Sequence, residues 1–380
     1  MAKWYQDAMW SVLRKILGPK MIKNYNMQAV FHDEEPEPPF ILMGNHSHKF
    51  DPYMVGYYMK NTVNYMANIE GVSALQRKLS DLVGAYGKKK GASDFKAIKD
   101  TVEMLRSGGV VGIFPEGDRS WDGETAAFIP GTAMLAKKYK VPIRVARLTG
   151  NYLTQPRWAD NPRRGRVLID FYTISAEEIA STSVKETEKK IFDMLNQDDI
   201  KNPLNNDIEF KGENLASGIQ RILWLCPECG EQDTLSGDGD DIVCSSCGSK
   251  WRINGSLKTS PEGKQGNDLK DWLVWQEEEM KKLCDGAGDS VLTKTENIVL
   301  SELVDHKMIK PCRGNMMLYA DRIEFMSEEC ENVTFANEFL VHYIDNFNKV
   351  FEFDYEKKRY RILFDGKNAS KWIFFLNYLK

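Results

Sequence analysis

The chain of 380 residues is 42% hydrophobic and 28% charged, a composition typical of a globular protein with two or three domains. It has no apolar run near the ~18 residues of a membrane span and no signal-peptide core, which favours a cytoplasmic location. The net charge of −4 conceals an asymmetry, because residues 1–175 carry +8 and the remainder carries −12. A basic half suits an anionic surface or a phosphorylated ligand, and no helix-turn-helix, RNP-like or basic-aromatic pattern favours nucleic acid.

Residues 1–20 predict an amphipathic helix that ends at Gly18-Pro19. Two interpretations stay open for it. The helix could pack on the domain that follows, or it could lie in a membrane interface, where Trp4 and Trp10 would be favoured. The apolar positions at helical spacing are Trp4, Tyr5, Ala8, Met9, Val12, Leu13, Ile16 and Leu17.

From residue 40 to about residue 175, short β-like runs alternate with helical patterns. This alternation predicts an α/β domain with a mostly parallel sheet covered by helices on both faces. A capping box at Ser175 and Glu178 begins the closing helices, which run to about Asn196. The expected strands are residues 40–43, 62–66, 82–86, 110–114, 141–148 and 166–173.

A histidine and a carboxylate follow the first of these strands. His46 comes directly after it, and Asp51-Pro52 is expected to cap and open the next helix. The turn can fold the carboxylate of Asp51 onto the imidazole, which fixes the tautomer and makes a neutral histidine a usable base. His48 lacks this spacing and is expected to be a surface or supporting group. For this pair alone, a plain helix cap and an ordinary turn histidine stay open as the alternative.

A second stretch places Glu116 and Arg119 after the strand at residues 110–114. In an open α/β sheet, ligands bind beyond the carboxyl ends of the strands. A base from one strand end, and a carboxylate and a guanidinium from the other, are therefore expected to meet. This second stretch shifts the balance for His46 from a turn residue to a catalytic base.

These two stretches, together with two later segments, resemble motif blocks of the lysophosphatidic acid acyltransferases. These are the glycerolipid acyltransferases with an H-x4-D motif. Asp118 stands where the family's F-P-E-G-T-R-S block has a threonine. The resemblance covers roughly the first half of the chain. The matching segments are Asn45-His46 with Asp51, Phe114-Pro115-Glu116-Gly117-Asp118-Arg119-Ser120, Phe128-Ile129-Pro130-Gly131 and Val141-Pro142-Ile143.

The resemblance implies an acyltransferase domain over residues 21–200. Such an enzyme moves a fatty acyl group from a thioester donor, acyl-CoA or acyl carrier protein, to the hydroxyl of a lysophosphatidic acid-like acceptor, giving phosphatidic acid. His46 would take the proton of that hydroxyl, and Asp51 would orient His46. The lipid substrate class also implies peripheral attachment to the inner face of the membrane.

The resemblance further implies a binding site for the glycerol phosphate. Lys88 stands where the family usually has an arginine, and a lysine lacks the bidentate fork of a guanidinium, so it is expected to assist only as a cation. The predicted substrate-binding residues are Asn45, Lys88, Glu116, Gly117 and Arg119.

Four of the seven cysteines form two C-x-x-C pairs with fourteen residues between the pairs. Four thiolates at this spacing predict a closed, structural zinc site in a zinc ribbon over residues 221–254. Free thiols, a redox role and an iron site of the same geometry stay as alternatives. The other three cysteines are expected to be reduced thiols rather than disulfides. The predicted metal ligands are Cys226, Cys229, Cys244 and Cys247.

The rest of the second half carries patterns but no motif. Residues 197–220 predict a polar linker with room for one strand, and residues 255–267 predict a mobile segment rich in glycine, serine and lysine. A helix over residues 268–284 and a run of short strands closed by a helix follow, so residues 290–380 resemble a PH-like or GRAM-like domain. A dimerisation or scaffold domain is the alternative, and the sequence leaves the oligomeric state undetermined.

These features also support a second functional hypothesis of a different class. The first half would then be a catalytically inert acyltransferase-like platform. The zinc ribbon and the PH-like domain would bind a lipid or a protein as a scaffold. The complete set of His46, Asp51, Glu116 and Arg119 argues for the enzyme.

Overall fold

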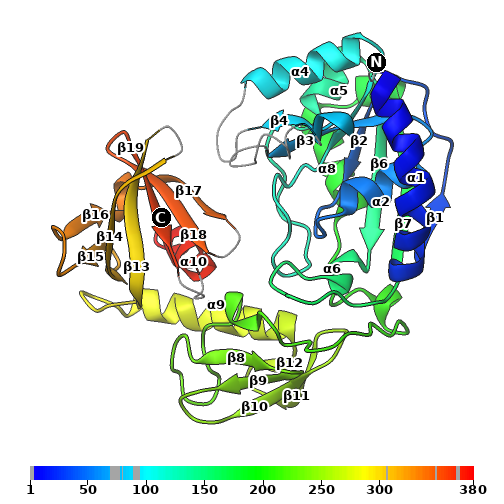
Figure 1. Ribbon diagram of the computed structural model, residues 1–380. Coiled ribbons are helices and arrows are strands. Elements are labelled where there is room, and N and C mark those ends of the chain that lie inside the picture. The colour runs from blue at the N-terminus through cyan, green and yellow to red at the C-terminus, as the bar shows by residue number, and fades with distance from the viewer. Residues whose placement is uncertain are drawn as a thin grey trace. The chain divides into compact units, whose positions relative to one another are not determined.

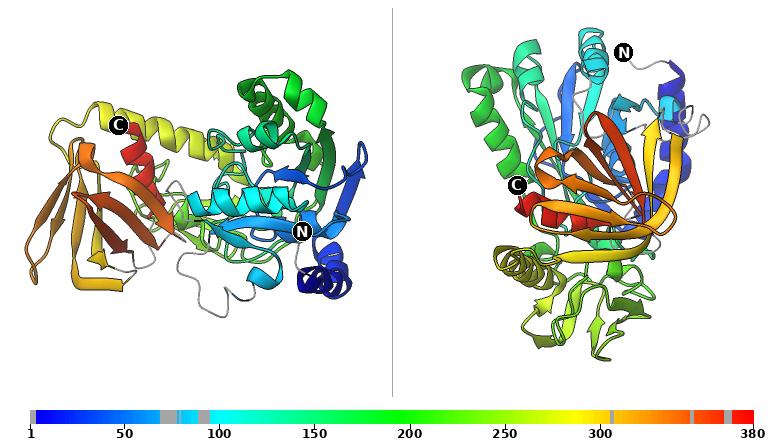
Figure 2. Two further views of the ribbon diagram at one scale, coloured as in Figure 1. Left: turned by 90° about the horizontal axis from the view of Figure 1, so that it is seen from above. Right: turned by 90° about the vertical axis from the view of Figure 1, so that its left-hand side faces the viewer.

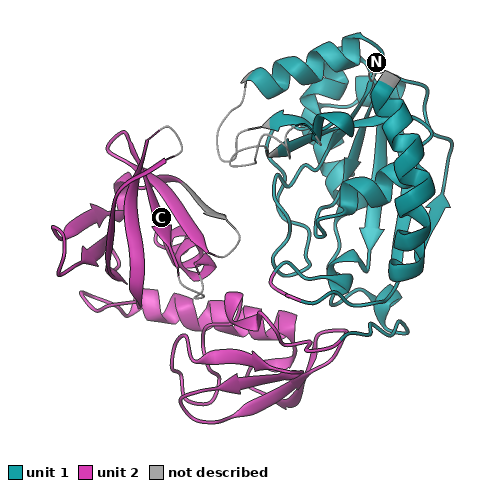
Figure 3. Ribbon diagram, in the orientation of Figure 1, with its two compact units in different colours: residues 1–157, 161–212 teal, residues 158–160, 213–380 magenta. Residues whose placement is uncertain are grey.

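The computed structural model describes residues 4–68, 78, 80–88, 95–304, 307–346, 349–364 and 369–380. The chain forms two compact units (Figure 3), which are Met1–Arg157 with Asn161–Gly212, and Trp158–Asp160 with Glu213–Lys380. The domain boundaries expected from the sequence are finer than this division and stay a prediction.

The first unit is built on a seven-stranded sheet with the strand order β1-β7-β6-β2-β5-β3-β4 (Figure 1). All neighbouring strands run parallel except β6 and β7, so the predicted mostly parallel sheet is confirmed. The strands are β1 (Met27–Phe31), β2 (Phe40–Gly44), β3 (Val63–Asn68), β4 (Tyr86–Lys88), β5 (Val110–Ile113), β6 (Ile143–Thr149) and β7 (Val167–Ile174).

Helices cover both faces of this sheet, as the alternating pattern predicts (Figure 2, right). On β2, Leu42 packs into the core under the first face and Ile41 into the core under the second. A strand buried on both faces needs apolar side chains at every position, which explains the continuous apolar run that predicted it. The first face carries α1 (Trp4–Tyr25) and α2 (Asp51–Tyr58), and the second carries α4 (Phe95–Arg106), α5 (Met134–Tyr139), α7 (Ala176–Ser181) and α8 (Val184–Leu195).

α1 is longer than the sequence pattern suggests. It continues through Gly18-Pro19 and ends at Tyr25. A Cβ atom on Gly18 would lie 2.1 Å from the ring of Tyr57 in α2, so the glycine allows a close approach of two helices instead of ending one. Within the described part of the chain, no helix is long and apolar enough to cross a membrane.

Two strands of the first unit also differ from expectation. β1 is a strand that the pattern missed, because most of its side chains are at least partly exposed and its hydrogen bonds come from β7, far along the chain. The strand expected over residues 82–86 is wrong, since Leu82 is helical and Gly84 turns the chain with a φ of 80°. β4 begins only at Tyr86.

The polar segment that follows α8 is packed on the first unit. Asp199 is fully buried and accepts hydrogen bonds from the backbone N–H groups of Gly150 at 2.7 Å and Tyr152 at 2.8 Å. Arg164 and Lys211 form an isolated β-bridge. The polar linker predicted here is therefore part of the folded first unit around Asp199, because this polar side chain satisfies backbone groups of the fold.

The second unit contains two antiparallel sheets, one of five strands and one of seven. Residues 255–267, expected to be mobile, form the strand β11 (Lys258–Gly263) and most of β12 (Gly266–Asp268). The antiparallel β domain expected near the C-terminus is present, and its PH-like or GRAM-like character stays a prediction. The elements are β8 (Leu235–Asp238), β9 (Asp241–Cys244), β10 (Lys250–Ile253), β11 (Lys258–Gly263), β12 (Gly266–Asp268), α9 (Leu269–Asp285), β13 (Thr293–Val304), β14 (Lys307–Leu318), β15 (Arg322–Met326), β16 (Val333–Ala336), β17 (Val341–Asn346), β18 (Val350–Tyr355), β19 (Lys358–Leu363) and α10 (Ser370–Tyr378).

Two cysteines of this unit are joined. Cys312 on β14 and Cys330, in the loop between β15 and β16, form a disulfide with their Cα atoms 6.4 Å apart. The prediction of reduced thiols is wrong for these two residues. The cause is tertiary, because β15 pairs with β14 and brings the following loop back beside Cys312.

Candidate active site

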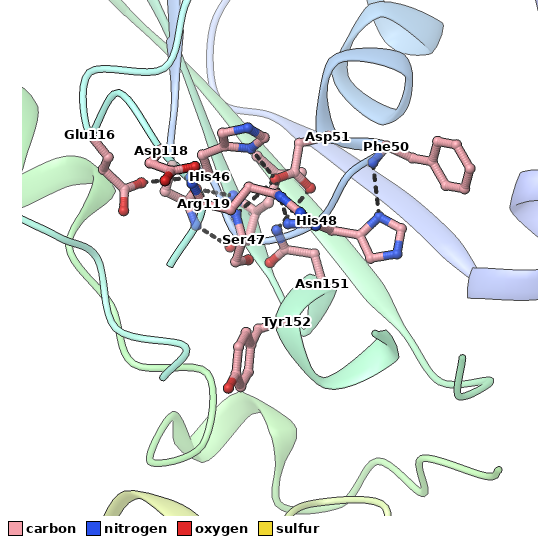
Figure 4. Close-up of polar contacts among 12 residues, drawn as sticks. His46, Ser47, His48, Phe50, Asp51, Glu116, Asp118, Arg119, Asn151 and Tyr152 are labelled. Carbon is pink, nitrogen blue, oxygen red and sulfur yellow. Dashed lines mark hydrogen bonds and ion pairs between the residues drawn. The ribbon is translucent and has the colours of Figure 1, made fainter. Parts of the chain in front are cut away.

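His46 and Asp51 lie between the carboxyl end of β2 and the start of α2 (Figure 4). Their side chains form a hydrogen bond of 2.9 Å between Nδ1 and Oδ2. The same oxygen accepts from the backbone N–H groups of Ser47 at 2.9 Å and His48 at 2.8 Å. The N-cap of α2 is Phe50, so the expected capping role of Asp51 is wrong. Its carboxylate closes the preceding turn around His46 instead.

The hydrogen bonds keep Asp51 ionised although it is fully buried. Burial by itself would raise the pKa of this carboxyl, but the hydrogen bond and charge of His46, together with His48, lower it below its ordinary value. An ionised carboxylate on Nδ1 requires that nitrogen to carry the proton, so the lone pair of His46 is on Nε2. Phe114 stacks on the imidazole with the ring centroids 4.3 Å apart, and the His46 side chain is 19% exposed.

His48 is fully buried and does not share this geometry. Its Nδ1 accepts the backbone N–H of Phe50 at 3.0 Å. Burial is the main cause that lowers the pKa of His48 to about 4, so it is neutral at physiological pH. Of the two expectations for His48, the surface group is wrong, and its burial beside the turn fits the supporting group.

Glu116 connects the loop after β5 to the backbone of His46. Its Oε1 accepts the N–H of His46 at 2.6 Å and its Oε2 accepts the N–H of Ala126 at 2.9 Å. The N–H of Ser120 donates in turn to the carbonyl oxygen of His46 at 2.8 Å. Burial raises the pKa of Glu116 to about 8, against the lowering effect of its two amide donors. The structure therefore shows Glu116 holding the backbone of His46, and its substrate-binding role stays a prediction.

Arg119 is held by its backbone. Its N–H donates to Oδ1 of Asp118 at 2.9 Å, and its carbonyl oxygen accepts from Nη1 of Arg157 at 2.8 Å. Among the described residues, no side chain forms a hydrogen bond or an ion pair with its guanidinium. Burial, followed by the charge of Arg157, lowers the pKa of Arg119. A partly buried guanidinium without a carboxylate partner can take an anionic ligand in a bidentate manner.

The other predicted ligands occupy different places. The side chain of Asn45 exchanges two hydrogen bonds, of 2.9 and 2.8 Å, with the backbone of Leu148, so its amide is used by the fold. Gly117 is an exposed turn residue with a φ of 76°. Lys88 ends β4 at the same edge of the sheet, and its side chain lies outside the described residues.

Sequence reasoning missed two side chains that contact this site. Asn151, directly after β6, donates from Nδ2 to Oδ1 of Asp51 at 3.0 Å. Arg157 pairs with Asp118 at 3.0 Å and bonds to Arg119. Both follow another strand end at the same edge of the sheet. That position, combined with a polar side chain, is the signal that could have identified Asn151.

The four cysteines of the two C-x-x-C pairs form a separate cluster in the second unit. Their sulfur atoms all lie within 4.8 Å of one another, and the Cys226–Cys247 and Cys229–Cys244 distances are each 3.8 Å. Four thiolates bound to one zinc ion at ~2.3 Å stand ~3.8 Å apart along each edge of the tetrahedron. The cluster is therefore compatible with one bound metal ion. The zinc-ribbon identity stays a prediction.

Comparison with known proteins connects this geometry to a family. Residues 22–146 match the family model described as Acyltransferase. The matched region contains His46, Asp51, Glu116 and Arg119, and the match supports the resemblance that these residues suggested. A similar solved structure is that of the 1-acyl-sn-glycerophosphate (LPA) acyltransferase PlsC from Thermotoga maritima, with 18% identity over 50% of this chain and 78% of that chain and a TM-score of 0.42. None of the curated proteins matches the chain.

Proposed function

We propose that this protein is an O-acyltransferase that transfers a fatty acyl group from a thioester, acyl-CoA or acyl carrier protein, to the hydroxyl of a lysophosphatidic acid-like acceptor. The observation that carries the proposal is the hydrogen-bonded pair of His46 and Asp51, with the lone pair of the imidazole on Nε2. On the adjoining loop, the Arg119 guanidinium has no hydrogen-bonded side-chain partner among the residues that the structure describes. The acyltransferase family match over residues 22–146 supports the same reaction class.

The reaction begins with proton transfer. Nε2 of His46 takes the proton of the acceptor hydroxyl as its oxygen attacks the thioester carbonyl, and Asp51 stabilises the imidazolium that forms. The tetrahedral intermediate then collapses with cleavage of the carbon–sulfur bond. The imidazolium returns its proton to the leaving thiolate, so the products are an ester and a thiol. The thioester supplies the activated acyl group, and no metal takes part in these steps.

Arg119 is proposed to bind the phosphate of the acceptor. A guanidinium matches phosphate with two parallel N–H donors, which orients the glycerol as well as holding it. Lys88, at the same edge of the sheet, is proposed to add a second positive charge. Glu116 contributes by fixing the backbone of His46, in addition to any contact with the acceptor that the family resemblance implies.

The outward side of α1 is proposed to hold the protein on the inner face of an anionic membrane. Val12 is 48% exposed and Ile16 is 56% exposed, and the exposed Lys15 and Lys20 lie among them. Trp10 is only 3% exposed and donates from its ring nitrogen to the carbonyl of Val83, so this tryptophan packs on the domain. The packing interpretation therefore applies to the side with Trp10, and attachment to a membrane is proposed only for the outward side.

The cysteine cluster is proposed to hold one structural zinc ion. A shell closed by four thiolates has no position for water or substrate, so the metal would stabilise the fold around it without acting on the thioester. Cys226, Cys229, Cys244 and Cys247 would supply all four ligands.

The test of the enzyme is product analysis with purified protein. The protein is given a panel of lysophospholipid acceptors with acyl-CoA or acyl-acyl carrier protein, and products are identified by mass spectrometry. Phosphatidic acid formed together with free thiol is the expected result. Thioester hydrolysis without acceptor acylation, or no consumption of any thioester, would reject the proposal and favour the inert-platform alternative.

A further inference from the structure

We infer that the segment Asn151–Arg157, which follows β6, positions both halves of the catalytic site. Asn151 orients the Asp51 carboxylate, and Arg157 fixes the loop that carries Arg119. The inference rests on the proposed acyltransferase function and adds positioning residues to it. The segment also lies outside the region matched by the acyltransferase family model, residues 22–146.

The first contact concerns the carboxylate of Asp51. Its Oδ2 accepts from His46, Ser47 and His48, whereas its Oδ1 accepts from Nδ2 of Asn151 at 3.0 Å. Both Asp51 and Asn151 are 0% exposed, so water does not replace a lost donor easily. A carboxylate that accepts hydrogen bonds on both oxygens cannot rotate about its Cβ–Cγ bond without losing some of them. Asn151 therefore fixes the plane in which Oδ2 meets the imidazole.

Asn151 is itself held firmly. It is the first residue of the short helix α6 (Asn151–Thr154). The buried Asp199 accepts from the N–H groups on both sides of it, Gly150 and Tyr152. Gly150 has a φ of 83°, and a Cβ atom there would lie 2.3 Å from the carbonyl oxygen of Arg166. These contacts set the position of the backbone from which Asn151 reaches Asp51.

The second contact concerns the loop with Arg119. The side chain of Arg157 is only 6% exposed, and its Nη1 donates to the carbonyl of Arg119 and pairs with Asp118. Its guanidinium carbon lies 3.9 Å from the centre of the Trp121 ring. Tyr152 adds a hydrogen bond of 2.6 Å from its hydroxyl to the carbonyl of Trp121. The loop is thus fixed at three residues by one segment, while the Arg119 side chain keeps its donors for a ligand.

The two contacts predict different kinetic effects. Asn151 acts on the base through Asp51, so its loss should lower kcat. Arg157 acts on the proposed phosphate-binding loop, so its loss should raise the acceptor KM. A segment that only stabilised the fold would change neither constant selectively.

The first experiment measures the pH–rate profile of Asn151→Ala and Asn151→Asp. Asn151→Ala should lower kcat by up to about 100-fold, because small misplacements of catalytic groups cost this much. Asn151→Asp places a second carboxylate beside Asp51, which favours protonation of the group that must act as base. The acid limb of the pH–rate profile should therefore lie at a higher pH in Asn151→Asp than in the wild type.

The matched control for these variants is Asn64. It is also buried, with 4% exposure, and it donates to the carbonyl of Val110 away from His46. Asn64→Ala and Asn64→Asp should leave the pH profile unchanged after correction for folded protein, which circular dichroism measures. Equal effects at Asn64 and Asn151 would overturn the positioning role.

The second experiment measures both substrate constants for Arg157→Ala and Arg157→Lys. Arg157→Ala should raise the acceptor KM about tenfold, the size expected for loss of a charged hydrogen bond, with the donor KM unchanged. Arg157→Lys should restore part of this loss. Arg144, with 0% exposure and an ion pair to Asp33, is the buried-arginine control. A change in kcat alone, or the same change in Arg144→Lys, would contradict the assignment.

A labelling experiment separates this inference from the proposed function. Diethyl pyrocarbonate modifies neutral imidazole, and peptide mass spectrometry reports its rate at His46 without any acyl transfer. The acid limb of that labelling rate should move to higher pH in Asn151→Asp and stay in place in Asn64→Asp. A shift in a protein that consumes no thioester would reject the enzyme and keep the positioning role. An unshifted limb in an active enzyme would overturn the positioning role alone.

Discussion

The cysteine cluster of the second unit and the candidate active site of the first unit bring polar side chains together in different ways. The most distant cysteines in contact, Cys226 and Cys247, are 21 residues apart. One C-x-x-C turn lies within the isolated β-bridge of Leu225 and Gln232, and the other begins at the end of β9. Asp51, in contrast, bonds to His46 five residues away and to Asn151 100 residues away. The bond between Glu116 and His46 spans 70 residues.

This difference has a physical origin. Thiolates need only a metal ion and two tight turns to reach their final geometry, so short spacing suffices. The candidate active site depends on a parallel sheet, in which neighbouring strands come from separate parts of the chain and their carboxyl ends meet at one edge. Substitutions at the candidate active site around His46 should therefore change chemistry, and substitutions in the cysteine cluster should change folding.

The largest expected effect is on turnover. His46→Ala and Asp51→Asn should each lower kcat by ~10²–10⁴, since general-base catalysis contributes this much. The fold should remain intact by circular dichroism. His32, whose Nε2 lies 2.8 Å from Oδ1 of Asp170, is a matched histidine–carboxylate pair away from the site. Full activity in His46→Ala with loss in His32→Ala would mean that the base has been misassigned.

The next prediction concerns the metal. Cys226→Ser should abolish zinc binding, measured by elemental analysis, and make the second unit sensitive to protease. The effect should extend beyond the cluster, because the adjacent Trp224 packs on Phe375 and its N–H bonds to Gln276. Acyl transfer in detergent-dispersed assays should survive.

The control for this prediction is Cys284→Ser, which changes a buried cysteine outside the cluster. It should keep the zinc. Wild-type protein without metal would reject the zinc site. A folded Cys226→Ser protein that had lost acyl transfer would show that the two units are coupled after all.

A smaller effect is expected on substrate recognition. Arg119→Lys should raise the acceptor KM about tenfold, because a lysine cannot make two parallel hydrogen bonds to a phosphate. The donor KM should stay constant when each substrate is varied in turn. Arg106→Lys, on α4, is the control for the loss of a guanidinium. An effect confined to the donor KM would place Arg119 on the thioester side of the site.

The pH dependence of stability gives a further prediction. Burial raises the pKa of Asp199 to about 7, so the folded protein keeps a proton that the unfolded chain releases near pH 4. The contribution of the protonated Asp199 carboxyl to the free energy of unfolding is fully present below about pH 4 and is lost as the pH rises through 7. Asp199→Asn should therefore flatten the decline in stability between pH 5 and pH 7, measured by hydrogen exchange of peptides from residues 1–212 in urea. Asp193→Asn, at an exposed carboxylate, should keep the wild-type slope.

The smallest expected effect is on membrane attachment. Ile16→Asp should reduce co-sedimentation with phosphatidylglycerol vesicles several-fold, because it puts a charge on the apolar side of α1. Ile98→Asp makes the same change at an exposed position on α4, where the exposed fraction is 46%. Equal loss of vesicle binding in both variants would show that only the change in net charge matters. No loss in either variant would reject the proposal that α1 binds the membrane.

Much of the candidate active site could be predicted from short segments. The apolar run before His46 specifies a strand buried on both faces, and the five-residue spacing to Asp51 fits a single turn. Glu116 could be placed nearby because it follows a second buried strand. Its bonds to backbone N–H groups could not be predicted, since a residue pattern shows a carboxylate but not its donor.

The sequence by itself determined the features whose interactions are local. They are the alternation of strands and helices, the turn from His46 to Asp51, and the spacing of the four cysteines. Only the tertiary structure decided the rest. It placed β1 beside β7, carried α1 past Gly18-Pro19 against α2, joined Cys312 to Cys330, and set Asn151 against Asp51. Each of these depends on a partner distant in the chain, and local periodicity carries no information about such a partner.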